Sequence, residues 1–139
     1  MSVWSHVAAI VRVDSFRLLG ESEPNWDDIF GKECLLESPS EVWDDAHEHP
    51  EKYLPMGSEG SLQKSVWVNP DKSCMDAYTV SIFGDLRDHK DAEGLIDWFK
   101  DIVANKVMTR QASITIDNIL YRPETITWVY MGEEEELDG

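Results

Sequence analysis

The chain has 139 residues, of which 42% are hydrophobic, and it carries a net charge of −16. This length and composition predict one folded domain rather than a disordered chain. The negative charge argues against direct binding to nucleic acid or to an anionic membrane, because clustered lysine and arginine side chains recognise both.

Two sequence patterns bear on localisation, an apolar run that spans a membrane and a signal peptide. The sequence contains no apolar run of about 18 residues and no basic segment followed by an apolar stretch, so we expect neither a membrane span nor a signal peptide. Cys34 and Cys74 are too few for a disulfide framework. We therefore expect a cytoplasmic protein with reduced thiols.

Most of the excess charge lies in residues 14–60, where thirteen Asp and Glu face Arg17, Lys32 and Lys52 for a net of −10. Residues 133–139 add five acids and are expected to form a disordered tail. Because like charges repel, residues 14–60 either serve solubility or form one exposed patch for a basic partner.

The first elements in chain order are a strand and two short helices. Alternating apolar residues predict a strand over residues 3–13. A short helix follows Pro24, with Trp26, Ile29 and Phe30 on one face. A second helix is predicted over residues 38–49, where Ser38 or Ser40 caps it, Val42, Trp43 and Ala46 form the buried stripe and Pro50 ends it.

The second half predicts four strands and a long helix. Residues 62–69 and 76–84 alternate as strands joined by a turn at residues 70–74, and residues 111–119 and 124–131 form a hairpin through residues 120–123. Between these pairs lies the strongest helix, capped by Asp88 or Asp91, with Leu95, Phe99 and Ile102 at helical spacing.

The order of these elements predicts an α+β fold. The first six follow the ferredoxin-like order βαββαβ, and the last strand would extend one edge of the sheet. We expect an antiparallel sheet covered by helices on one face. Residues 1–132 would form this single domain, with residues 14–60 as an acidic helical insertion and residues 133–139 as the tail.

Residues 85–91 (DLRDHKD) form the best candidate for catalysis. Asp85, Asp88 and His89 could supply an acid and a base. The ordinary interpretation is that aspartates before a helix cap it and complement its dipole. We therefore expect no enzymatic activity and keep a small enzyme that uses these three residues as an alternative.

Metal and cofactor motifs are weak. His47 and His49 are two residues apart, which separates them on a helix, and no third ligand has a recognised spacing. GSEGS at residues 57–61 lacks the lysine of a phosphate-binding loop. Cys34 lies in acidic surroundings that disfavour a reactive thiolate. No cofactor and no metal are expected.

The tryptophans divide into two groups. Trp67, Trp98 and Trp128 fall in the predicted sheet and helix, where core packing accounts for them. Trp26 and Trp43 each precede two aspartates, and such a ring beside carboxylates can dock on arginine side chains. Alternatively, each ring holds its helix to the core. The predicted partner-binding residues are Trp26, Asp27, Asp28, Glu41, Trp43, Asp44, Asp45, Glu48 and Glu51.

The segments YLPMGSEGSL, SVWVNP and AYTVSIFGDLRDHKDAEGLIDWFK resemble a family of small acidic proteins from phages and mobile elements of Gram-positive bacteria. The similarity runs from about residue 3 to 131 and carries no functional residues. It implies the context of phage inhibitors of host defence, including anti-CRISPR proteins that mimic nucleic acid. A strand, the helix LIDWFKDI and a following strand are also similar to α+β immunity proteins that neutralise bacterial toxins.

The predicted function is therefore binding rather than catalysis. The acidic face of residues 21–51 would occupy a basic groove on a nucleic-acid-handling host protein and block its natural ligand. Three alternatives stay open: an immunity protein against a basic toxin, the small enzyme described above, and an accessory protein whose charge serves only solubility. The edge strand at residues 124–131 could also pair with a second copy.

Overall fold

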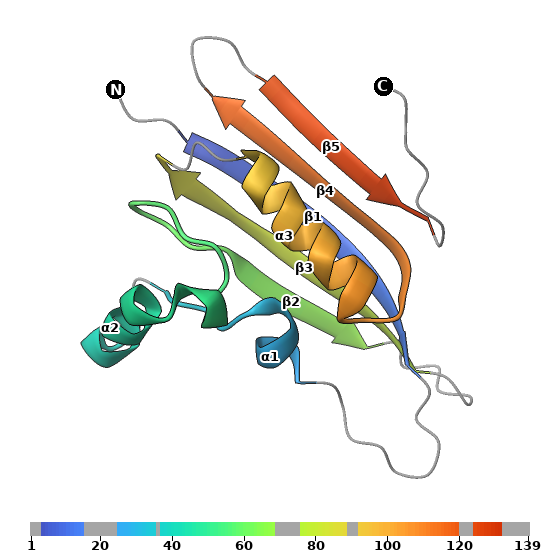
Figure 1. Cartoon of the computed structure of the whole chain (residues 1–139), viewed down its shortest axis with the longest axis horizontal. Helices are drawn as coiled ribbons and strands as arrows, with labels where there is room; N and C mark the ends of the chain where they lie inside the picture. The colour runs from blue at the N-terminus through green and yellow to red at the C-terminus, as the bar shows by residue number, and fades with distance from the viewer. Residues whose placement is uncertain are drawn as a thin grey trace.

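A computed structural model describes residues 4–15, 25–35, 37–68, 76–88, 92–119 and 124–131. Its strands and helices follow the predicted order (Figure 1). They are β1 (Trp4–Ser15), α1 (Trp26–Phe30), α2 (Ser40–Glu48), the 3-10 helix η1 (Pro50–Lys52), β2 (Gln63–Val68), β3 (Asp76–Arg87), α3 (Ala92–Asn105), β4 (Thr109–Ile119) and β5 (Glu124–Tyr130).

The five strands form one sheet in the order β2-β3-β1-β4-β5, and every neighbouring pair is antiparallel. β1 lies at the centre, where Val11 is opposite Val80 of β3 and Ala112 of β4. All three side chains are buried. The predicted α+β fold with an antiparallel sheet is therefore confirmed.

One face of this sheet, the covered face, carries α1 and α3 (Figure 1). In α3 the buried side chains Leu95, Phe99 and Ile102 recur at the helical spacing that the sequence predicts. In α1, Phe30 joins the same core and Trp26 packs against the ring of Tyr78 at 5.1 Å. Both helices therefore bury their apolar sides against one hydrophobic layer.

The opposite face, the open face, has no helix over it among the described residues (Figure 1). It presents the alternate positions of each strand, and Ile10, Trp67 and Phe83 are 49%, 56% and 43% exposed there. The expectation that Trp67 packs in the core is therefore wrong. Val66 and Val68 face the covered side, and strand alternation turns the indole between them outward.

Trp98 and Trp128 follow the prediction more closely. Both are partly buried against the core, and Trp128 meets Phe99 edge to face at 5.8 Å. Lys100 of α3 lies over the Trp128 ring at 5.5 Å.

Helix starts differ in detail from the sequence-based expectations. Asn25 caps α1 through its side chain, a role that the sequence analysis did not assign. Pro39 occupies the N-cap position of α2 without a side-chain cap, while the Ser38 hydroxyl accepts the N–H of Leu35 instead. α3 begins at Ala92, and its predicted cap Asp91 lies outside the described residues.

Several other predictions fall on residues that the structure does not describe: the turns at residues 70–74 and 120–123, His89, Cys74 and the acidic tail 133–139. Within the described ranges, no helix has the length and hydropathy that crossing a membrane requires.

Candidate functional site

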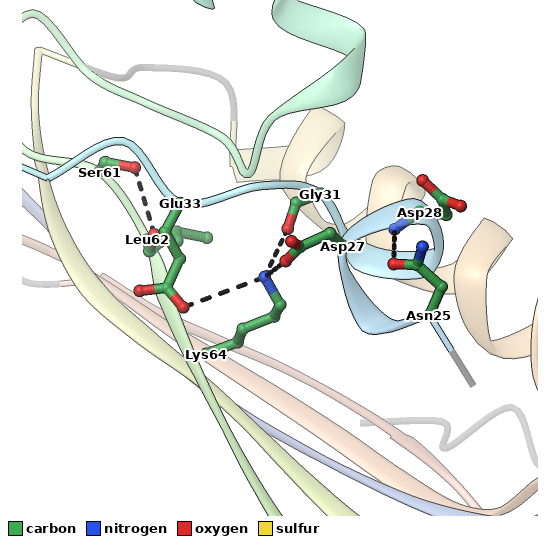
Figure 2. A network of polar contacts seen from close by, with 8 residues as sticks. All are labelled: Asn25, Asp27, Asp28, Gly31, Glu33, Ser61, Leu62 and Lys64. Carbon is green, nitrogen blue, oxygen red and sulfur yellow. Dashed lines mark hydrogen bonds and ion pairs between the residues drawn. The ribbon is translucent and has the colours of Figure 1, made fainter. Parts of the chain in front are cut away.

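Lys64 of β2 attaches the acidic segment to the sheet (Figure 2). Its side chain is only 7% exposed, and its ammonium donates to Asp27 at 2.5 Å and to the carbonyl oxygen of Gly31 at 2.8 Å. Glu33 lies 3.9 Å away on the other side. Two of the acidic side chains that the sequence counted as available charge are therefore compensated inside the molecule.

The backbone around α1 is fixed by close contacts. Asn25 accepts the N–H of Asp28 at 3.2 Å, which satisfies one of the free donors of the first turn (Figure 2). Gly31 ends the helix with a φ of +118°, and a Cβ there would lie 2.6 Å from the nitrogen of Leu54. The neighbouring Lys32 forms a parallel bridge with Tyr53.

Trp26 also holds α1 in place, through contacts of its ring. The centre of its ring lies 6.1 Å from that of Phe30 and 5.1 Å from that of Tyr78, and the side chain is partly buried against the main core. This arrangement holds α1 to the sheet, which is the structural role weighed for Trp26 in the sequence.

α2 packs on a separate small core beyond β2 (Figure 1). The buried members of this second core are Cys34, Ala46 and Tyr53, and Val42, Trp43 and Met56 pack around them. Trp43 therefore also anchors its helix. Burial raises the pKa of the Cys34 thiol, so the thiolate form is disfavoured and the residue behaves as a small apolar side chain.

The carboxylate of Asp45 already has a hydrogen-bond partner in this second core. The hydroxyl of Tyr53 donates to its Oδ2 at 2.7 Å. This hydrogen bond is the main cause that lowers the pKa of Asp45 and raises the pKa of Tyr53 to about 12. Asp45 thus positions α2 through Tyr53.

The outer face of α2 is different. Glu41, Asp44 and Glu48 are exposed, and no cation pairs with them among the described residues. Their spacing of three and four residues places them along one side of the helix, with neighbouring Cβ atoms about 5–6 Å apart. We call these three residues the α2 stripe.

The α1 part of the predicted site differs from the α2 stripe in the balance of the surrounding charges. A cleft of about 510 Å³ is formed there by α1, η1 and α3. Its charged lining consists of three acids and three lysines: Asp27, Asp28, Glu51, Lys32, Lys52 and Lys106. The carboxylates around α1 therefore lie among cations, whereas the α2 stripe does not.

A second exposed acidic row lies on α3. Glu93, Asp97 and Asp101 recur every four residues on the side of the helix that faces away from the sheet, and all three are exposed. We call them the α3 stripe. Exposed negative charge is thus spread over the helical side of the molecule rather than confined to residues 14–60.

The structure describes two members of the possible catalytic set of residues 85–91, Asp85 and Asp88, and the two contact different partners. β3 continues to Arg87, so Asp85 lies within the strand on the open face, where its carboxylate contacts Nδ1 of His6. Asp88 accepts the hydroxyl of Ser58 at 3.2 Å. The third member, His89, lies outside the described residues.

The GSEGS segment is bound along the end of β3. Ser58 donates its N–H to the carbonyl of Arg87 at 2.8 Å, and Arg87 donates its N–H to the carbonyl of Glu59 at 3.0 Å. A Cβ on Gly60 would lie 2.1 Å from the carbonyl oxygen of Asp85. The glycines therefore permit close backbone approach, which explains this motif without a ligand.

The two histidines of the HEH motif also contact neighbouring residues of the chain. Nδ1 of His47 contacts the carbonyl of Trp43 at 2.7 Å, and His49 lies 3.5 Å from Glu51. In the described part of the chain, no three His, Cys, Asp or Glu side chains are grouped so that they could hold a metal ion.

Sequence reasoning missed Lys64, Tyr53 and His6. Lys64 carries a readable signal, because it lies two and four residues before Val66 and Val68 in the strand and must face the same side of the sheet. The partners of Tyr53 and His6 depend on tertiary packing and on strand register, which local patterns do not specify. Comparison with known proteins adds no further guide: no family model, curated protein or solved structure matches the chain.

Proposed function

We propose that this protein is a non-enzymatic binding protein whose α2 stripe docks on the basic surface of a nucleic-acid-handling host protein. The observation that carries the proposal is the set of exposed carboxylates of Glu41, Asp44 and Glu48, which have no cation partner among the described residues. Three uncompensated charges on one rigid helix face form a defined ligand for lysine and arginine side chains.

The position of α2 favours this use. The helix lies at the margin of the molecule beyond β2 and packs on its own small core (Figure 1). The sheet therefore does not obstruct its outer face. Carboxylates about 5–6 Å apart can take the place of successive phosphates in a basic groove, and complementary charge speeds the encounter of the two proteins.

The proposed site is narrower than the set predicted from the sequence. Glu41, Asp44 and Glu48 make the contacts, whereas Trp43 and Asp45 hold the helix in place through the second core. Trp26, Asp27, Asp28 and Glu51 belong to the charge-balanced surroundings of α1 and support the segment.

The proposal also includes the fold family and the biological context of the protein. The position of β1 between β3 and β4, with β2 beside β3, supports a ferredoxin-like domain in which short helices replace the first long helix and β5 extends the β4 edge. The resemblance to small acidic phage proteins supports a role against host defence in the cytoplasm of a Gram-positive bacterium. No catalytic step and no cofactor are assigned.

A binding panel tests the proposal. Purified nucleic-acid-binding proteins from a Gram-positive host, including an RNA-guided nuclease, are titrated with the full chain between about 50 and 200 mM salt. We expect one partner whose affinity falls as salt rises and whose complex is displaced by added DNA or RNA. Binding that is indifferent to salt and to nucleic acid would refute the mimic mechanism.

A further inference from the structure

The open face carries more apolar surface than a solvated sheet face usually does. Trp4, Ile10, Phe83 and Trp67 are 36% to 56% exposed, and they come from three adjacent strands, β1, β3 and β2. Ile10 and Phe83 lie close to the centre, because Ala8 is opposite Phe83 and Ile10 is opposite Ser81. Several large apolar side chains exposed on one sheet face are typical of an interaction site.

The charged side chains that the described residues place on the same face balance one another, in a chain of −16. Among the described residues they are three arginines and three aspartates: Arg12, Arg87, Arg110, Asp14, Asp85 and Asp117. Two copies that approach through their helical sides repel one another, because both sides are acidic. The open face is the surface through which two copies can approach without that cost.

The charges on this face are also arranged in a self-complementary way. At one end of the strands, His6 lies between its cross-strand neighbours Asp85 and Asp117. Arg12 is exposed at the other end of the face, three alternate positions after His6 along β1. A two-fold axis in the plane of the interface, perpendicular to the strands and between Ala8 and Ile10, brings Arg12 of each copy over the aspartate end of the other.

The ends of β2 follow the same symmetry. Trp67 is opposite Thr79, in the row of Arg12. A cleft of about 540 Å³ lies at the other end of β2, between the strand end and the second core, and is lined by Gly60, Ser61, Gln63, Gly84 and Asp85 on one side and by Cys34, Leu35, Glu37 and Trp43 on the other. The same rotation places the exposed indole of one copy near this cleft of its partner. An isologous interface requires this kind of match between a protrusion and a hollow.

The size of the face is sufficient for a weak or moderate dimer. Five strands of 6 to 12 residues, about 4.8 Å apart and with about 3.3 Å per residue, cover roughly 700 Å² per copy. Twice that area reaches the lower range of specific interfaces, which begins near 1,200 Å² in total.

We propose that two copies of this chain associate face to face through the open face, with Ile10 and Phe83 at the centre. The acidic helices then lie on the two outer sides of the dimer, which leaves both α2 stripes exposed. The proposal is independent of what the α2 stripe binds.

Sedimentation velocity of the full chain over a wide concentration range tests this dimer. We expect a particle of twice the 15.9 kDa of one chain, stabilised by added salt because salt screens the repulsion between two acidic molecules. A wild-type chain that stays monomeric at high salt and high concentration would overturn the proposal.

Variants locate the interface. The double variant I10K/F83K should be monomeric, whereas A104K, which adds a lysine at an exposed position of α3 on the other side of the sheet, should dimerise like the wild type. Circular dichroism establishes that each variant is folded. A dimer that survives I10K/F83K, including one formed through the β5 edge, or a dimer lost equally in A104K, would contradict the proposed face.

Charge exchange gives a second readout that does not depend on apolar residues. R12D and D117R alone should each weaken the dimer at least about tenfold, and the double variant should recover most of that loss because the opposed charges are exchanged. Failure of the double variant to recover would refute the two-fold arrangement.

Discussion

The side of the sheet that carries the helices, here the helical side, and the open face differ in how their apolar residues are covered and in how their charges are balanced. The helical side covers its core with α1 and α3 and presents exposed acids, including the α2 and α3 stripes. Among the described residues, the open face has no helix over it and presents apolar side chains together with equal numbers of arginines and aspartates. Net charge per chain therefore says little about where charge is available, which depends on pairing and on the face.

The comparison also separates two kinds of acid within one segment. Asp27 and Asp45 have internal partners, Lys64 and Tyr53, whereas Glu41 and Asp44 have none among the described residues. A carboxylate already paired within the fold gains less from a new cation. Function is therefore expected from the uncompensated subset.

The largest expected effect compares one phenylalanine from each face. Phe99 is fully buried under the covered face, so F99A should lower the free energy of unfolding by about 3–5 kcal/mol. Phe83 is 43% exposed on the open face, so F83A should cost less than about 1 kcal/mol in the monomer. Urea denaturation of both variants at low protein concentration measures the difference, and equal losses would mean that the open face is covered.

The second effect concerns the attachment of α1. In K64M the carbonyl of Gly31 loses its donor and the carboxylates of Asp27 and Glu33 lose their shared cation, which should cost about 1–3 kcal/mol. Hydrogen exchange at residues 26–35 should rise more than in the sheet. K106M removes an exposed lysine and serves as the control; similar behaviour of both variants would remove the anchoring role.

The third effect is a pH dependence that belongs to α2. Because the folded pKa of Tyr53 is about 12 against an ordinary value of 10, its contribution to stability is complete below pH 10 and is lost as pH rises toward about 12. The lowered pKa of Asp45 acts at the other end, where stability falls as pH drops through that pKa.

Tyrosinate absorbance during an alkaline titration measures the high-pH part. The difference between the titrations of the wild type and Y53F should be a tyrosine that ionises near pH 12. If the titrations of wild type and Y53F differ instead by a tyrosine that ionises near pH 10, the hydrogen bond to Asp45 is not formed in solution.

The smallest effect is expected for the α2 stripe itself. E41Q/D44N/E48Q removes three exposed charges that have no partner among the described residues, so the free energy of unfolding should change by less than about 0.5 kcal/mol. Thermal denaturation checks this result. A large loss of stability would show that the stripe is structural rather than available for binding.

The sequence predicted the strands, the long helix and the antiparallel α+β fold because apolar residues recur at two-residue and helical spacings. Local spacing does not show which face of a sheet receives a cover, so Trp67 was placed in the core, although it alternates with inward-facing Val66 and Val68. The contacts of Lys64 and His6 cross between distant segments, and they depend on the strand register. Of the candidate site, the sequence identified the acidic side chains, but not which of them are compensated.

The most direct measurement is the affinity of a partner from the binding panel for two variants of equal charge. E41Q/D44N/E48Q removes the α2 stripe, and E93Q/D97N/D101N removes the α3 stripe. We expect the first to weaken binding at least about tenfold, which corresponds to about 1.4 kcal/mol, and the second to change it less than about twofold. Equal losses in both variants would show that net charge alone governs binding and would contradict the assignment of the α2 stripe.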